Sequence, residues 1–333
     1  MLSAFGKAFR TPDLRKKIFF TLSIMALFRF GSVVPTPGVS YKNVQECLSQ
    51  VQSGGLFGLI NLFSGGALLH LSVFALGIMP YITSSIIVQL LTVVIPRFEA
   101  LKNEGQSGTA KLTQYTRYLT VGLAILQSTG LVAVARTTGR LINGCTLPII
   151  PDTSWQRIVT MIFVMTAGTA VIMWLGELIT DRGVGNGMSI LIFTSIAAGF
   201  PGNLWSIKLQ KGLFAFLFVL AVGILVVMAV VFVEQAQRRI PVQYAKRMVG
   251  RQTYGGTSTY IPIKVNQAGV IPVIFASSLL YIPSLIVNFT NSQAAWAVWI
   301  SRNFVKGDHP YYVLTYALLI IFFTYFYVAI TFN

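Results

Sequence analysis

A short apolar segment placed directly before a long one, between residues 53 and 95, constrains the fold more than any other feature of the sequence. Residues 56–63 are apolar but too few to cross a bilayer, which takes about 20 helical residues. Residues 71–95 are uncharged and long enough to cross. Because non-helical backbone at membrane depth survives only where protein or a water-filled cavity covers it, we interpret the short segment as a mobile half-crossing folded into a cavity. The alternative is an amphipathic segment at the membrane surface, followed by an ordinary helix.

Composition extends the membrane interpretation to the whole chain. Of the residues, 54% are hydrophobic and 10% are charged, whereas soluble domains contain about 25% charged residues. The basic N-terminus leads directly into the first apolar run, so we expect no cleaved signal peptide. We therefore expect an all-α integral membrane protein with eight crossings, at residues 18–34, 71–95, 118–134, 158–176, 188–200, 213–233, 265–287 and 311–332. The crossing at 188–200 is shorter than the hydrocarbon layer, so it is expected to be shielded from lipid by protein.

The distribution of positive charge predicts the orientation of the chain. With the N-terminus in the cytoplasm, sixteen of the 25 Lys and Arg residues fall on the cytoplasmic side and seven on the other side. This bias is the one that the positive-inside rule describes. Arg29 lies near the middle of the first crossing, where a charge is costly in lipid, so it is expected to face protein, water or a headgroup.

Catalytic and metal-binding patterns are not evident in the sequence. The nine acidic residues lie in predicted loops or at helix ends, which argues against a proton- or sodium-coupled carrier. The two His and two Cys residues have no metal-ligand spacing, so we expect no metal. The sequence shows no nucleophile–base pair and no phosphate-binding loop, so we expect no cofactor and no enzyme activity. Cys47 and Cys145 fall on the same external side, where a disulfide and two free thiols are both possible.

Two polar features within this apolar chain remain open to two interpretations each. Gln89, Gln127 and Asn266 lie in three different crossings, and they either form a polar seam that opens between helices or join helices in the ordinary way. The loop at residues 234–264 has six Lys or Arg residues, one acidic residue and three tyrosines. It is either a docking site for RNA or an acidic protein, or a retention signal that fixes topology; its length favours docking.

Six longer motifs resemble the SecY family of protein translocon subunits, in order and over the whole chain. They are FSGGAL at 63–68, FALGIMPYITSSIIVQLLTVVIP at 74–96, QYTRY at 114–118, GVGNGMSILIF at 183–193, QRRIPVQYAKR at 237–247 and KVNQAGVIPVIFASS at 264–278. The N-terminal sequence and MVGRQTYGGTSTY at 248–260 are most similar to members from high-GC Gram-positive bacteria.

The resemblance implies an inverted-repeat helical bundle with a pore at its centre. It divides the chain into a cytoplasmic N-terminus at 1–17, an N-terminal half at 18–200 and a C-terminal half at 201–333 with the basic loop at 234–264. The family pattern continues beyond residue 333 through another basic loop and two helices, so this chain alone is expected to form an incomplete pore.

The family pattern also assigns roles to individual residues. It implies a pore ring of Ile78, Ile82, Ile192, Ile196 and Ile274, and a plug at 56–67 that includes Leu56, Phe57, Leu59, Ile60, Asn61, Leu62 and Phe63. It implies a lateral gate with Thr83, Gln89, Gln127 and Asn266, and a docking site for the SecA motor and the ribosome at Arg238, Arg239, Lys246 and Arg247. An apolar ring dewets when empty and so blocks ions.

The implied function is a protein-conducting channel in the cytoplasmic membrane, which translocates unfolded preproteins and releases transmembrane segments into the lipid. The implied partners are SecE, SecG, SecA, the ribosome, signal sequences and preproteins, membrane lipids, and also SecDF and YidC. The alternatives are an inverted-repeat solute transporter and a non-conducting assembly or regulatory membrane protein.

Overall fold

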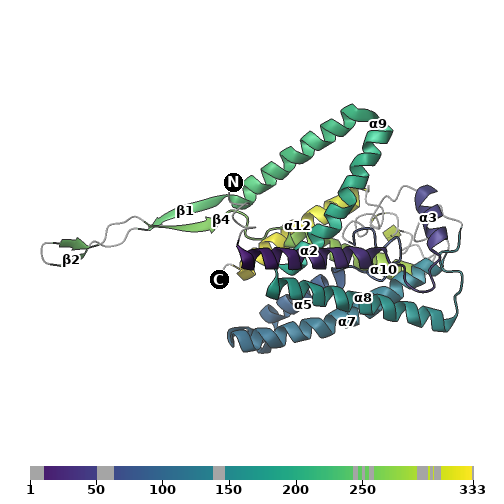
Figure 1. The fold of residues 1–333 in the computed structure, drawn as a ribbon. Coiled ribbons are helices and arrows are strands. Elements are labelled where there is room, and N and C mark those ends of the chain that lie inside the picture. Colours follow the sequence, from purple (N-terminus) through teal and green to yellow (C-terminus); the bar gives the residue numbers. More distant parts are fainter. Residues whose placement is uncertain are drawn as a thin grey trace. The chain divides into compact units, whose positions relative to one another are not determined.

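The computed structural model describes residues 11–50, 64–137, 147–242, 247–249, 252–254, 259–290, 299–300, 303 and 309–331. Helices predominate among these residues (Figure 1). The chain divides into two compact units, of which the first comprises Met1–Gly202 and Phe275–Leu318 and the second Asn203–Ile274 and Leu319–Asn333.

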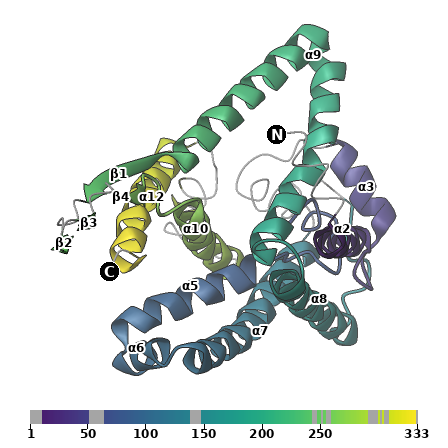
Figure 2. The same cartoon turned by 60° about the vertical axis from the view of Figure 1, so that its left-hand side comes forward.

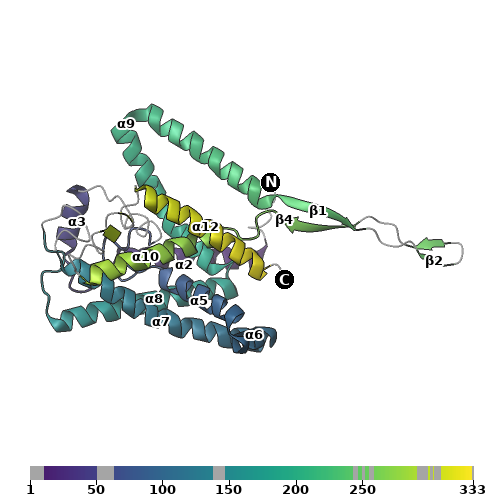
Figure 3. The ribbon, with the colours of Figure 1, turned by 180° about the vertical axis from the view of Figure 1, so that it is seen from behind.

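The first unit is built on long helices that pack side by side. Its elements are α2 (Pro12–Val33), α3 (Tyr41–Gln50), α5 (Met79–Val94), α6 (Pro96–Asn103), α7 (Gln106–Arg136), α8 (Trp155–Arg182) and the first part of α9 (Gly187–Gln235). Helix α7 packs against both α5 and α8, and α2 packs against α8, as seen from both sides in Figures 1 and 3.

Small residues allow α7 to approach its neighbours closely. Thr116, Thr120, Ala124 and Ser128 recur every four positions and are all buried, so they form one face of the helix. The hydroxyl groups of Thr116 and Thr120 donate hydrogen bonds to the carbonyl oxygens four residues earlier. A face of small residues with internally satisfied hydroxyls suits helix packing in a membrane.

Residues 64–78 form successive turns rather than a helix, and we call them the turn segment. The sequence analysis expected a crossing from residue 71 to residue 95, but the helix there, α5, begins at Met79. Leu71 (φ 46°) and Gly77 (φ 57°) have backbone conformations that a right-handed helix excludes, and Pro80 stands in the first turn of α5, where proline favours a helix start.

The turn segment is fixed to the first helix and its following loop by backbone hydrogen bonds. The amide of Thr36 donates to the carbonyl of Leu71 at 3.0 Å, and the amide of Val73 donates to the carbonyl of Val34 at 2.9 Å. On another side, Gly168 of α8 lies so close to the turn segment that a Cβ atom would overlap with the carbonyl oxygen of Val73. The turn segment is therefore surrounded by helices of its own unit.

The remaining predicted crossings coincide with helices whose bounds differ from the expected ones. The crossings at 188–200 and 213–233 are joined in α9, which contains Pro201 and is interrupted only by the non-helical backbone of Gly212. The crossing expected from residue 265 begins later, as α10 (Ile271–Thr290), and the last is α12 (Pro310–Thr331). Among the described residues, four helices are long and apolar enough to cross a membrane, and α5 with α6 makes a fifth if the 100° bend between them belongs to one span.

The basic loop of the second unit contains a β-ribbon that the sequence analysis did not predict. Strands β1 (Gln237–Val242) and β4 (Thr259–Lys264) pair in antiparallel fashion, with Gln237 opposite Lys264 and Val242 opposite Thr259. Farther along the same projection, β2 (Arg247–Val249) pairs with β3 (Gln252–Tyr254). Figure 2 shows β1 continuing from the end of α9.

Of the two possibilities for the cysteines, the structure has Cys47 buried and disulfide-bonded. The chain contains one other cysteine, Cys145, which lies outside the described residues.

Because α8 and the turn segment are in close contact, one methyl group added to α8 at Gly168 is expected to change the free energy of unfolding strongly. Gly168→Ala is expected to lower the free energy of unfolding by about 1–3 kcal/mol, because its Cβ would displace the Val73 carbonyl. The measurement is thermal unfolding of the purified full-length protein in detergent. Gly122→Ala on α7 is the matched control, because no atom lies within 4 Å of its Cβ position. Equal unfolding temperatures for the two variants would contradict the prediction.

Candidate functional site

An apolar cluster in the first unit brings together three of the isoleucines expected in the pore ring. Ile78 is 2% exposed and belongs to the core of the cluster, and Ile82 and Ile192 pack against that core. The other buried members come from α2, the turn segment, α8 and α9: Ile24, Phe28, Phe74, Ile172, Leu175, Ile179 and Leu191. Residues far apart in the sequence thus meet in one apolar region.

Ile78 and Ile82 are placed by the junction between the turn segment and α5. Ile78 is the residue before α5 and already has helical backbone angles. The amide of Ile82 donates to the carbonyl of Ile78 at 3.2 Å, so the two residues stand one turn apart on one face.

Ile192 is placed by the start of α9. The side chain of Asn186 accepts hydrogen bonds from the amides of Met188 and Ser189, at 3.0 and 3.3 Å, which is the usual arrangement of an N-cap residue. One residue before Ile192, Leu191 is fully buried in the apolar cluster. The cap therefore fixes where α9 begins and which of its residues enter the cluster.

The other two isoleucines lie elsewhere. Ile196, one turn beyond Ile192 on α9, is 38% exposed. Ile274 is 8% exposed and lies in the first turn of α10, within the second unit. The five-residue ring therefore stays a prediction, of which three members share one cluster.

Arg29 contacts the turn segment directly, as a charge in the middle of a crossing requires. Its Nη1 donates a hydrogen bond to the carbonyl oxygen of Gly65 at 2.6 Å and a longer one to Ser32. Gly65 has a positive φ of 66°, and a Cβ there would come within 3.2 Å of the Cα of Ser195 on α9. Gly65, within the 56–67 segment expected to form the plug, is thus held between α2 and α9. Those plug residues, Leu56 to Phe63, lie outside the described residues.

The expected gate residues have different surroundings. Thr83 on α5 donates to the carbonyl of Met79 in its own helix. Gln89, also on α5, lines a groove of about 330 Å³ with Tyr81 of the same helix, Lys102 of α6 and Thr113 of α7. Gln127 is half-buried on α7, and Asn266 lies in the second unit, before the start of α10. Their common role in a gate remains a prediction.

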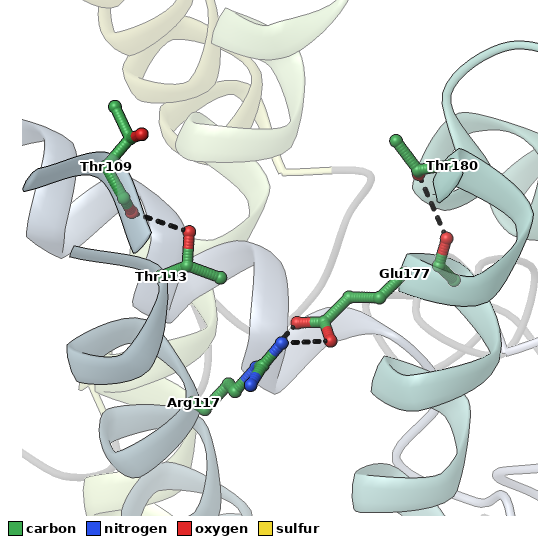
Figure 4. A network of polar contacts seen from close by, with 6 residues as sticks. Thr109, Thr113, Arg117, Glu177 and Thr180 are labelled. Carbon is green, nitrogen blue, oxygen red and sulfur yellow. Dashed lines mark hydrogen bonds and ion pairs between the residues drawn. The ribbon is translucent and has the colours of Figure 1, made fainter. Parts of the chain in front are cut away.

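An ion pair that the sequence analysis did not identify joins α7 to α8 (Figure 4). The Nε and Nη2 atoms of Arg117 donate to the two carboxylate oxygens of Glu177 at 2.9 and 2.7 Å. The two residues, with Trp174 and Asp181, line a groove of about 380 Å³. The sequence contains one signal for this ion pair, namely that two opposite charges lie near the cytoplasmic ends of two consecutive predicted crossings. This signal was not specific, because 60 residues separate Arg117 from Glu177 in the sequence.

The β1–β4 ribbon exposes two of the expected docking arginines on opposite faces. Arg239 pairs with Pro262 across the ribbon, so it shares a face with Tyr260 and Lys264, and its guanidinium lies 4.7 Å from the centre of the Tyr260 ring. Arg238 pairs with Ile263 and shares the other face with Ile240 and Ile261, which are 42% and 54% exposed. Arg247 begins β2, and Lys246 lies outside the described residues.

Within the part of the chain that the structure describes, no group of His, Cys, Asp and Glu residues could hold a metal ion.

The comparisons with known proteins agree on one family. The SecY family model matches residues 72–333. The protein translocase subunit SecY of Streptomyces griseus is 66% identical over 339 residues, which are 100% of this chain and 77% of the relative. The SecY subunit of Mycobacterium tuberculosis H37Rv is 57% identical over 342 residues, and the comparison covers 100% of this chain and 77% of the relative.

Two solved structures have the same fold at low sequence identity. They are a protein-conducting channel, with a TM-score of 0.55 and 18% identity, and Sec61 in the canine ribosome–channel complex from the endoplasmic reticulum, with a TM-score of 0.53 and 17% identity. Each comparison covers 82% of this chain but only 58% of the solved chain. This chain thus spans less than two thirds of the length of the solved channels.

The Arg117–Glu177 pair predicts measurable coupling between α7 and α8. A double-mutant cycle with Arg117→Ala and Glu177→Ala is expected to give about 1 kcal/mol of coupling in the free energy of unfolding, because the pair is bidentate and Glu177 is only 20% exposed. The Lys111–Glu104 pair, with 56% and 49% exposed side chains, is the control and is expected to give about 0.3 kcal/mol. Coupling no larger than that of the control pair would show that Arg117 and Glu177 do not stabilise this contact.

Proposed function

The chain belongs to the SecY family, and from this premise we propose that it forms part of the pore of a protein-conducting channel in the cytoplasmic membrane. The channel passes unfolded preproteins across the membrane and releases transmembrane segments sideways into the lipid. The 66% identical relative is named as a protein translocase subunit, and a solved protein-conducting channel shares the fold.

The single observation that carries this proposal is the convergence of Ile78, Ile82 and Ile192 on one apolar cluster. Two regions that are separate in the sequence supply it: the junction of the turn segment with α5, and α9. Closely spaced apolar side chains exclude water from a narrow passage, and a passage without water does not conduct ions. Ile196 and Ile274 complete the ring in this proposal. Apolar side chains also make no hydrogen bonds that would retain a passing chain.

The plug and gate follow from the same proposal. Residues 56–67 close the outer side of the passage at rest, and Arg29 holds the carbonyl of Gly65 at the end of this segment. A signal sequence enters beside Thr83, Gln89 and Gln127 of α5 and α7 and Asn266 before α10, and it exchanges polar contacts for apolar ones there.

The ribbon is the proposed docking site for the ribosome and for the SecA motor. The face with Arg239, Tyr260 and Lys264 combines positive charge with an aromatic ring, which suits ribosomal RNA. The face with Arg238 also carries the exposed apolar side chains of Ile240 and Ile261, which suits a protein partner.

Orientation, energy source and partners complete the proposal. The N-terminus and the ribbon face the cytoplasm, in agreement with the distribution of Lys and Arg. SecE and SecG complete the complex, and SecA or translation supplies the energy. The chain itself contributes no catalysis.

Replacing seal residues by glycine is expected to open the passage to ions. Ile78→Gly and Ile192→Gly, made in the full-length protein, should each raise the resting ion conductance of reconstituted channels several-fold, because each removes an apolar side chain from the cluster. Ile321→Gly on α12, 53% exposed, is the control for a substitution within a membrane helix. Unchanged conductance would favour a non-conducting assembly protein. The same proteoliposomes also test the transporter alternative. That alternative would be favoured if they take up a labelled solute but do not protect a preprotein from protease when SecA and ATP are added.

The two faces of the ribbon are expected to contribute differently to ribosome binding. Arg239→Ala should weaken the affinity for the ribosome. It should also lower the slope of log K, where K is the binding constant, against log salt concentration by about 1, as for the loss of one phosphate contact. Arg238→Ala removes the same charge from the opposite face and is the matched control, for which a smaller change in slope is expected. The measurement is a salt titration of ribosome binding to the reconstituted complex. Equal slopes for the two variants would contradict the assignment of faces.

A further inference from the structure

The short helix α3 covers the turn segment directly after the residues expected to form the plug. Val44 and Cys47 of α3 stand three positions apart on one face of the helix, and both are fully buried. They share one apolar cluster with Leu68, Leu69 and Leu71 of the turn segment. A helix outside the predicted crossings therefore packs on the backbone at the end of the plug segment.

Residues 147–150 complete this cover, and together with α3 we call them the cap. Ile149 is buried in the same apolar cluster as α3. The amide of Ser40 donates a hydrogen bond to the carbonyl of Ile149 at 3.0 Å, and the side-chain amide of Asn43 donates to the carbonyl of Pro148 at 2.8 Å. Both hydrogen bonds lie at the start of α3, so they hold one end of the helix against the rest of the cap.

A disulfide holds the other half of α3. Cys47 lies in the second half of the helix and is disulfide-bonded. The chain contains one other cysteine, Cys145, shortly before Leu147 in the sequence. A bond between the two cysteines would join the second half of α3 to the chain that leads into residues 147–150, so that the cap is held at both ends.

The position of α3 is connected to the turn segment by a short path of backbone hydrogen bonds. The amide of Val39 donates to the carbonyl of Thr36 at 3.2 Å, and the amide of Thr36 donates to the carbonyl of Leu71 at 3.0 Å. Leu71 has a φ of 46°, a conformation that a residue other than glycine keeps only where its surroundings impose it. The buried side chain of Leu71 lies under the cap, so its conformation depends on the cap staying in place.

We propose that a disulfide between Cys47 and Cys145 is a covalent lock on the cap, and that the locked cap holds the turn segment, and with it the plug, in the closed position. In the proposed orientation both thiols are external, where oxidising conditions allow the bond. When it forms, two protons and two electrons pass from the thiols to an external disulfide, which becomes a dithiol. The passage is therefore fully closed only after this oxidation. Cys47 and Cys145 are positioning residues, and their effect on conductance rests on the proposed function.

Amide hydrogen exchange in the turn segment tests the lock without reference to conduction. In the full-length protein in detergent, Cys47→Ser and Cys145→Ser should each raise the exchange rate of residues 64–78 by about tenfold. Exchange follows the free energy of local opening, and a disulfide that closes a long loop opposes such opening. A dithiol reductant should produce the same rise in the unmodified protein and no further rise in Cys47→Ser.

Gly108→Ala is the control for a general loss of stability. A Cβ at Gly108 on α7 would overlap with the carbonyl oxygen of Leu101, at the contact between α6 and α7 and not at the cap. This variant should lower the unfolding temperature and leave the exchange rate of residues 64–78 unchanged. The same increase in exchange with Gly108→Ala as with Cys47→Ser would overturn the lock, because any destabilisation would then suffice.

Resting ion conductance of the reconstituted variants separates the lock from the proposed function. Cys47→Ser should raise it several-fold, in the same direction as Ile78→Gly. A folded Cys47→Ser variant with unchanged exchange would overturn the lock, and so would a Cys145→Ser variant with the exchange rate of the unmodified protein. If Cys47→Ser does not fold, reduction of the unmodified protein gives the same decision.

Two further outcomes distinguish the two proposals. If Ile78→Gly raises the conductance and Cys47→Ser speeds exchange without raising it, the role of the lock in closure is wrong. If Cys47→Ser speeds exchange while neither variant changes the conductance, the lock on the turn segment remains and the proposed pore fails.

Discussion

Backbone that leaves the helical conformation at membrane depth must find hydrogen-bond partners inside the protein, and the arrangement of the first unit follows from this requirement. In the turn segment, Leu71 and Val73 are paired with the backbone at Thr36 and Val34, and the carbonyl of Gly65 is paired with Arg29. The partners all come from α2 and the residues that follow it. Without them the turn segment would expose polar groups to lipid, at a cost of several kcal/mol for each group.

The same requirement explains why the apolar cluster lies where it does. The turn segment ends at Ile78, and it contacts α8 closely at Gly168 and α9 closely at Ser195. A seal made only of side chains on straight helices would shift with every helix that moves. Here Ile78 is placed by the junction of the turn segment with α5, and Ile192 by a capped helix start. The proposed seal depends on this placement, because side chains without polar groups close a passage only where the backbone holds them in position.

Hydropathy was sufficient to predict where the long helices lie, because each is an apolar run bounded by polar residues, although four of the described helices, or five with the bent pair α5 and α6, are long and apolar enough to cross a membrane. It could not locate the start of α5, since residues 71–78 are as apolar as the helix that follows and their conformation depends on hydrogen bonds to residues about 35 positions earlier. The sequence analysis missed the ribbon because each of its two strands contains a proline, Pro241 or Pro262, and proline normally argues against a strand. A two-stranded ribbon tolerates proline because both of its strands are edge strands. The isoleucines were selected by resemblance alone, and their meeting in one cluster required the fold.

The acidic residues show how a chain with 25 basic and nine acidic residues uses its few carboxylates. Glu177 lies inside α8, more than one turn before the helix ends at Arg182, whereas Glu234 lies in the last turn of α9, where the helix dipole disfavours a carboxylate. Each is bound by a side chain from another element, Glu177 by Arg117 and Glu234 by Asn266. In both cases the stabilisation lies in the contact between elements. At the end of α9 a neutral residue would suit the helix better by itself, so the chain gives up local helix stability there for a defined position of the helix end against the turn before α10.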